Sequence, residues 1–134
     1  MRVVLDTNVV ISGIFFGGVP GEIVKELAEA RFSAFATPLI LEEYLETIQE
    51  ISRSKPAPLL KEWLEILPSL FHVIPDIEIR GALSRDLFDD KFLLCAAKAR
   101  VQYLVTGDKD FSDLKSKFDF QILSPREFLS KIGA

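Results

Sequence analysis

VVLDTNVV, residues 3–10, runs from apolar residues into an acid, a hydroxyl and an amide, and then becomes apolar again. The segment Val3–Leu5 predicts a strand buried on both faces, because its apolar side chains follow one another without alternation. The strand ends in Asp6 rather than in a glycine turn. An aspartate at this position either bonds backbone amides in a turn or is a functional group at the end of a buried strand.

Short apolar segments alternate with amphipathic segments along the rest of the chain. Glycine and proline residues interrupt positions 17–21, and 76–88 is interpreted as a connection. The predicted strands are 33–37, 71–74, 103–106 and 121–123, and the predicted helices are 22–32, 38–51, a segment opened by Pro56 and Pro58 that runs to 67, 90–100, 110–118 and 125–132. Apolar strands separated by helices are typical of a parallel sheet with helices on both faces. The sequence therefore predicts an α/β fold, a three-layer α/β/α sandwich around a central, mainly parallel sheet of four to five short strands.

Size and composition limit the classes of protein that fit. A chain of 134 residues predicts a single domain over 1–134, and 49% hydrophobic with 27% charged residues is typical of a soluble globular protein. No apolar run approaches the roughly 20 residues of a membrane helix, and nothing before Val3 resembles a secretion signal, so we expect a cytoplasmic protein without a membrane partner. The single Cys95 and the single His72 exclude a disulfide framework and a Cys/His zinc site.

Charge is distributed unevenly along the chain. Residues 1–79 hold 6 Lys and Arg against 12 Asp and Glu, whereas residues 80–134 hold 10 against 8. The net charge of −4 disfavours bulk binding of nucleic acid, so any polyanion would need a local basic patch in the second half. The alternative interpretation of these charges is an ordinary solvated surface.

Acids follow two predicted strands and open one predicted helix. Asp6 follows the first strand, and Asp108 follows the strand at 103–106. In open parallel sheets, ligands bind at the carboxyl ends of the strands, near the switch in strand order. At 100° per residue, Asp89 lies on the side of the helix 90–100 that carries its apolar stripe. Three carboxylates from distant parts of the chain can therefore converge at one end of one sheet.

Each acid also has a purely structural interpretation. Asp6 can belong to a turn, Gly107 and Asp108 form a common turn dipeptide, and Asp86 or Asp89 can cap a helix with a gain of about 1 kcal/mol. Glu43 lies opposite the apolar face of its own helix, together with Glu42, Glu46 and Glu50. Periodicity therefore predicts that all four glutamates are solvated.

The chemistry of a converging cluster favours a metal ion. Carboxylates within about 5 Å of one another repel, so some take up a proton unless a cation neutralises them. With oxygen ligands and neither a thiolate nor a histidine pair available, that cation would be Mg²⁺ or Mn²⁺. A metal held in this way is suited to phosphate chemistry, because it polarises a phosphoryl oxygen and lowers the pKa of a bound water.

Three segments carry a resemblance to a known family. DTNVVISGIF (6–15), LEEYLETI (41–48) and RDLFDDKFLLCAAKARVQYLVTGDKDF (85–111) resemble the PIN-domain family, and more narrowly the VapC-like prokaryotic PIN proteins known as toxins of toxin–antitoxin pairs. The similarity extends from residue 3 to about 124 in the same order. It implies a Mg²⁺- or Mn²⁺-dependent endoribonuclease. The metal ligands and catalytic acids would be Asp6, Glu43, Asp89 and Asp108, with Asn8, Thr106 and Asp86 in support.

The residues lead to a hypothesis for the mechanism, and the resemblance implies the protein partners. Asp6 and Asp108 would hold the primary metal, while Asp89 and Glu43 complete the site directly or through water. An activated water would attack a backbone phosphorus of RNA, and the 3′ oxygen would leave. Arg85 and Lys109, from the basic half of the chain, would follow the RNA backbone. A homodimer and a small antitoxin protein would be the protein partners.

The sequence departs from the family pattern after the first acid of the helix-opening motif. Leu87 and Asp90 stand where relatives often have proline and asparagine, so Asp90 remains an alternative to Asp89. A haloacid-dehalogenase-like phosphatase is another possible enzyme class, but it needs an aspartate at the position of Asn8. A non-catalytic PIN-like module that binds RNA or protein is the alternative from a different class.

Overall fold

The computed structural model describes residues 1–55, 60–76, 87–114 and 118–133, with backbone alone for 87–90 and 112–114. The sequence predictions for Arg85 and Asp86 lie outside the described residues. For Asp89 and Asp90, the structure describes the position of the backbone but not that of the side chains.

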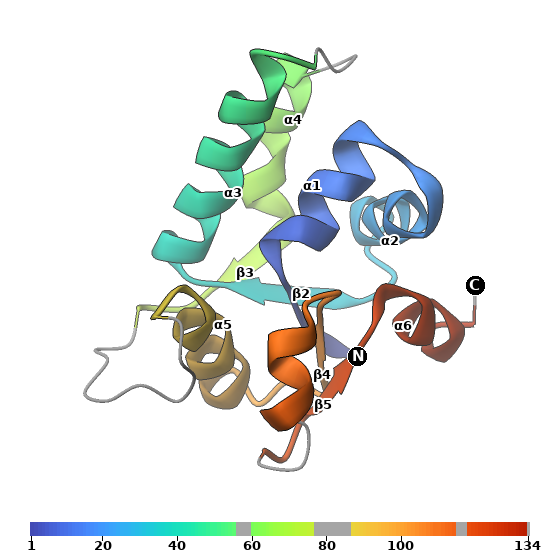
Figure 1. The fold of residues 1–134 in the computed structure, drawn as a ribbon, viewed down its shortest axis with the longest axis vertical. Coiled ribbons are helices and arrows are strands. Elements are labelled where there is room, and N and C mark those ends of the chain that lie inside the picture. Colours follow the sequence, from blue (N-terminus) through green and yellow to red (C-terminus); the bar gives the residue numbers. More distant parts are fainter. Residues whose placement is uncertain (56–59, 77–86, 115–117, 134) are drawn as a thin grey trace.

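A five-stranded, all-parallel sheet forms the centre of the fold (Figure 1). The order of the strands is β3-β2-β1-β4-β5, so the direction in which strands are added reverses between β1 and β4. Val4 of β1 pairs with Leu104 of β4, which brings the carboxyl ends of these two strands to the same level. The strands are β1 (Arg2–Leu5), β2 (Ser33–Ala36), β3 (Phe71–Val73), β4 (Tyr103–Val105) and β5 (Gln121–Leu123).

Helices cover both faces of this sheet, which confirms the predicted α/β architecture. The helical elements are α1 (Thr7–Phe15), α2 (Gly18–Ala28), α3 (Pro38–Ser52), α4 (Leu60–Ile66), the 3₁₀ turn η1 (Leu67–Leu70), α5 (Leu87–Lys98), the 3₁₀ segment η2 (Lys109–Leu114) and α6 (Pro125–Lys131). Figure 1 shows α1, α2, α3 and α4 above the sheet and α5 below it, and α5 packs on β1, β2 and β4.

Local capping explains why two of the helices begin directly after strands. The Thr37 hydroxyl accepts a hydrogen bond from the Ile40 N–H at 3.3 Å, and Pro38 occupies the first helical position of α3. Ser124 and Glu127 form a reciprocal capping box at the start of α6. Both helices therefore start within two residues of the preceding strand, which fixes the short connections of the parallel sheet.

The helices α1 and α2 differ from the sequence prediction. The segment after Asp6 had no predicted helix, and the next helix was predicted at 22–32, but α1 begins at Thr7 and α2 spans Gly18–Ala28. The physical reason is that Gly17 and Gly18 adopt φ of +75° and +64°, which turns the chain sharply between two helices. The glycine-rich stretch therefore joins two helices rather than separating a strand from a helix.

Two further element predictions are corrected. In its described part, the predicted helix 110–118 is a 3₁₀ segment, η2 (Lys109–Leu114). The predicted helix 90–100 begins earlier, at Leu87, and its last helical residue is Lys98. Asp89 consequently lies in the first turn of α5 rather than ahead of it. The helix predicted after Pro56 is described from Leu60 onward, as α4.

The core lies between the sheet and its two helical layers. Val3, Val4 and Leu5 are fully buried, as the continuous apolar run predicted. Cys95 is also fully buried among core residues of α5, which confirms its predicted packing role, and burial raises the pKa of its thiol to about 12. No single helix among the described residues is long and apolar enough to cross a membrane, although α1 and α2 together meet that test as a pair bent by 98°.

Candidate metal centre

The carboxyl ends of β1 and β4 bring Asp6 and Thr106 together. The Asp6 N–H donates to the Val105 carbonyl at 2.9 Å, so the ladder between the two strands continues to the site itself. The Thr106 hydroxyl then donates to Oδ2 of Asp6 at 2.7 Å and accepts the Asp108 N–H at 3.0 Å. One buried hydroxyl thus links two acids that are about 100 residues apart in the sequence.

Asp108 is held by its own short turn. Its Oδ1 accepts the Asp110 N–H at 2.9 Å, which is the Asx-type bond that aspartate commonly makes two residues ahead. The turn predicted at Gly107 and Asp108 is therefore observed. It leaves Asp108 close enough to Asp6 for its charge to raise the pKa of Asp6. Asp108 retains a second carboxylate oxygen, Oδ2, that takes no part in the bond to the Asp110 N–H.

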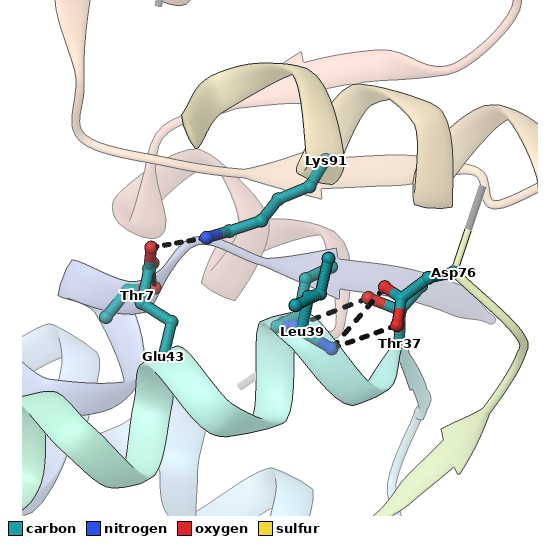
Figure 2. Close-up of polar contacts among 7 residues, drawn as sticks. Thr7, Thr37, Leu39, Glu43, Asp76 and Lys91 are labelled. Atoms are coloured by element: carbon teal, nitrogen blue, oxygen red, sulfur yellow. Dashed lines mark hydrogen bonds and ion pairs between the residues drawn. The ribbon is translucent and has the colours of Figure 1, made fainter. Parts of the chain in front are cut away.

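Glu43 joins the site from α3, and its neighbour Tyr44 explains how. Tyr44 is fully buried and its hydroxyl donates to the Leu5 carbonyl at 2.5 Å, which fixes α3 beside the end of β1. Glu43 Oε2 accepts the Thr7 hydroxyl, and Oε1 accepts the Lys91 ammonium at 2.6 Å (Figure 2). This ion pair joins α3 and α5, which lie on opposite faces of the sheet.

The prediction that Glu43 is solvated is wrong. Glu42, Glu46 and Glu50 are exposed as periodicity predicted, whereas the Glu43 side chain is only 24% exposed. Helical periodicity identifies the face of α3 that packs on the core, but it carries no information about α1 and α5, which approach α3 beside the carboxyl end of β1. The resemblance to the PIN family pointed to Glu43, whose carboxylate contacts Thr7 and Lys91, whereas periodicity did not distinguish it from its neighbours.

The electrostatic environment of Asp6 reflects all three acids. Burial raises the pKa of Asp6, and the charges of Asp108 and Glu43 raise it further. The Thr106 hydroxyl and the Thr7 backbone N–H lower the pKa in part, because they stabilise the ionised form. The pKa of Tyr44 is also raised, mainly because the side chain is buried and to a smaller extent by the charges of Asp6 and Glu43. The site therefore favours either a proton or a bound cation.

The donor set is suited to a hard divalent cation. Among the residues with described side chains, no group of three or more acidic, histidine or cysteine side chains stands close enough together to hold a metal. Mg²⁺ in proteins commonly uses one or two carboxylates and completes its shell with water. The two carboxylates of Asp6 and Asp108 fit that requirement, whereas both oxygens of Glu43 are already bonded.

The remaining predicted residues lie around this cluster. Asn8 is exposed on α1, and the hydrogen bond that orients Asp6 comes from Thr106 instead. Lys109 is exposed and lines a cavity of about 170 Å³ together with Thr106 and Asp108.

Sequence reasoning missed two residues, Thr7 and Lys91. Thr7 stands directly after Asp6, and Lys91 directly after two aspartates. Adjacency to predicted acids was the available signal in both cases.

Comparisons with known proteins identify the family and the fold. A family model described as the PIN domain matches residues 2–110. Uncharacterized protein MJ1680 of Methanocaldococcus jannaschii is 28% identical over 149 aligned residues, which cover 98% of this chain and 91% of that protein. The fold is similar to a chain in the crystal structure of VapBC2 from Rickettsia felis bound to a DNA fragment from their promoter. The TM-score is 0.60, with 17% identity and coverage of 92% of this chain and 98% of that one. The resemblance predicted from the sequence is thus confirmed, and the chain belongs to the PIN-domain family.

Proposed function

We propose that this PIN domain, over residues 1–134, is a Mg²⁺- or Mn²⁺-dependent endoribonuclease. PIN domains are typically nucleases and generally bind these ions. The observation that carries the proposal is the hydrogen-bonded link from Asp6 through Thr106 to Asp108 at the switch in strand order. This is the position at which open parallel sheets bind their ligands.

The residues of the site divide the work among them. Asp6 and Asp108 hold the cation; Thr106 orients the Asp6 carboxylate and fixes the backbone of Asp108. Asp89, or Asp90 in its place, supplies a further carboxylate from the first turn of α5, and Glu43 acts through water. When bound, Mg²⁺ or Mn²⁺ polarises a phosphoryl oxygen and lowers the pKa of a water for attack on phosphorus.

RNA is the proposed substrate, and its backbone would lie across the open side of the site. Lys109 at the rim of the cavity beside Asp108 is suited to a phosphate contact, and Arg85 is the second proposed phosphate contact. Asn8, exposed at the start of α1, is available to a passing backbone. A haloacid-dehalogenase-like phosphatase would need a second aspartate at position 8, so this alternative is less well supported.

The proposed protein partners follow from the likeness to the VapBC2 chain. We propose that the chain forms a homodimer in the cytoplasm and that a small antitoxin protein controls its activity. Co-purification with the product of an adjacent small gene, followed by mass determination of the complex, would test this part of the proposal.

Cleavage of total RNA with and without Mn²⁺ tests the enzymatic part. The wild-type protein should cut RNA with Mn²⁺ and lose that activity in EDTA, and Asp6→Asn should reduce the rate by about 100-fold or more. Asp119→Asn is the matched control, because Asp119 is exposed and lies away from the site. Full cleavage in EDTA would contradict the metal mechanism. No cleavage with any divalent ion, and no metal-linked rise in melting temperature, would favour the non-catalytic module.

A further inference from the structure

Lys91 forms an ion pair with Glu43, and the proposed mechanism gives this lysine no role. Its ammonium lies 2.6 Å from Oε1 of Glu43, and the two side chains are only 15% and 24% exposed. Figure 2 shows the lysine reaching from α5 across to α3, with Thr7 beside the same carboxylate. A partly buried pair with this geometry is a stronger constraint than an exposed surface ion pair.

The charges of the site explain why such a lysine is present. Asp6, Glu43 and Asp108 act on one another electrostatically, since both of the other acids raise the pKa of Asp6. Without a cation, three ionised carboxylates in this space would destabilise the fold. The Lys91 ammonium offsets one of those charges, and it does so at the acid that comes from a helix rather than from a strand end.

We infer that Lys91 is the resident counter-cation of the site, and that its ammonium and a divalent ion on Asp6 and Asp108 are alternative partners for Glu43. This inference rests on the proposed function, because it concerns the same metal centre. A divalent ion repels the ammonium and attracts Glu43, so Lys91–Glu43 pairing and metal binding oppose each other. Lys91 is thus a positioning residue that keeps Glu43 away from the metal and weakens metal binding.

Mn²⁺ binding without RNA tests this antagonism directly. We expect Lys91→Met to bind Mn²⁺ at least about fivefold more tightly than the wild type, as measured by electron paramagnetic resonance of the free ion. Lys91→Arg keeps the charge and should retain wild-type affinity. Lys98→Met, which removes an exposed lysine in the last turn of the same helix, should also leave the affinity unchanged.

The competing outcomes are distinct. If Lys91→Met binds Mn²⁺ as the wild type does, or more weakly, the inference is overturned, because a lysine with only a structural role would not tighten binding when removed. A wild type that binds Mn²⁺ without any response to Lys91→Met overturns the inference alone. A wild type that binds no Mn²⁺ overturns the metal mechanism of the proposed function together with the antagonism.

A second measurement covers the case in which Lys91→Met does not fold. In the wild-type protein, Mg²⁺ should increase the acylation rate of the Lys91 amine, as followed by mass spectrometry, because the amine loses its ion pair with Glu43. Lys98 serves as the internal reference and should react at the same rate with and without Mg²⁺. An unchanged Lys91 rate in a protein that binds Mg²⁺ would contradict the inference.

Discussion

Two parts of the acidic site are held in place by different kinds of structure. Asp6 and Asp108 follow β1 and β4, and the backbone ladder between these strands extends to Asp6. Glu43 lies on α3 and is held by side-chain contacts, from Thr7 of α1 and Lys91 of α5. The strand-end acids therefore have positions set by the sheet, whereas the position of Glu43 depends on side-chain contacts with two other helices.

This difference predicts unequal consequences for removing the acids. Glu43→Gln should reduce RNA cleavage by about 10-fold, compared with about 100-fold or more for Asp6→Asn, because in the proposed mechanism Glu43 acts through water whereas Asp6 holds the cation. Single-turnover cleavage rates at saturating Mn²⁺ measure both. Equal losses for the two variants would show that the helix-borne acid is as essential as the strand-end acid.

Gly13 controls how closely α1, which carries Thr7, approaches α2. A Cβ at this position would lie 2.3 Å from Cγ2 of Val24 and 2.6 Å from the carbonyl oxygen of Pro20. Gly13→Ala should therefore lower the free energy of unfolding by about 2 kcal/mol, since the backbone oxygen cannot move cheaply. Urea unfolding measures this change.

Gly21→Ala provides the control for that substitution, because Gly21 is also helical but its added Cβ meets only an ordinary contact at 3.7 Å. That variant should be as stable as the wild type or more stable by about 0.5 kcal/mol, since alanine favours the helix. A Gly13→Ala protein of unchanged stability would show that α1 can shift away from α2, and the Thr7 contact should then be the first part of the site to change.

The two threonines of the site allow a matched test of the comparison. Thr106→Val removes the hydroxyl that donates to the buried Asp6 carboxylate, and we expect a loss of about 1–2 kcal/mol in the free energy of unfolding. Thr7→Val should cost less, about 0.5 kcal/mol, because Glu43 keeps its bond to Lys91 and some contact with water. A larger loss for Thr7→Val in metal-free urea unfolding would reverse the proposed ranking of the two regions.

The smallest expected effect is the pH dependence that Asp6 gives to the stability of the metal-free protein. The pKa of Asp6 in the folded protein is raised above its ordinary value of 3.8, mainly by burial. The folded state therefore binds the proton more tightly than the unfolded state. The contribution of Asp6 to the free energy of unfolding is therefore fully present below pH 3.8. It declines as the pH rises through the pKa of Asp6 in the folded state.

Asp6→Asn removes this titration and its repulsion toward the other acids. In EDTA at neutral pH, the melting temperature of the variant should be no lower than that of the wild type. As the pH falls toward 4, the melting temperature of the wild type should rise relative to that of the variant. Thermal unfolding at a series of pH values measures this trend. A wild type that gains stability over Asp6→Asn as the pH rises, without metal, would contradict the raised pKa.

The strands and the strand-end acids were predictable because their causes are local. The apolar run Val3–Leu5 could not be solvated, and the parallel sheet that it implies has its ligands at the carboxyl ends. Asp6 and Asp108 were consequently predicted from the residues alone. The helix α1 was missed because VVLDTNVV continues as an apolar segment, and the glycines at 17 and 18 were interpreted as a break rather than as the turn between two helices.

Glu43, Thr7 and Lys91 show what local patterns leave undetermined. Whether Glu43 faces water depends on its contacts with Thr7 and Lys91, which are 36 and 48 positions away in the sequence. The sequence by itself determined the alternating α/β order, the buried strands and the acids that end two of them, because hydrophobic periodicity and turn chemistry act over a few residues. Only the tertiary structure decided how Glu43 is held and that a lysine accompanies it, because those contacts form where helices from opposite faces of the sheet meet beside the carboxyl end of β1.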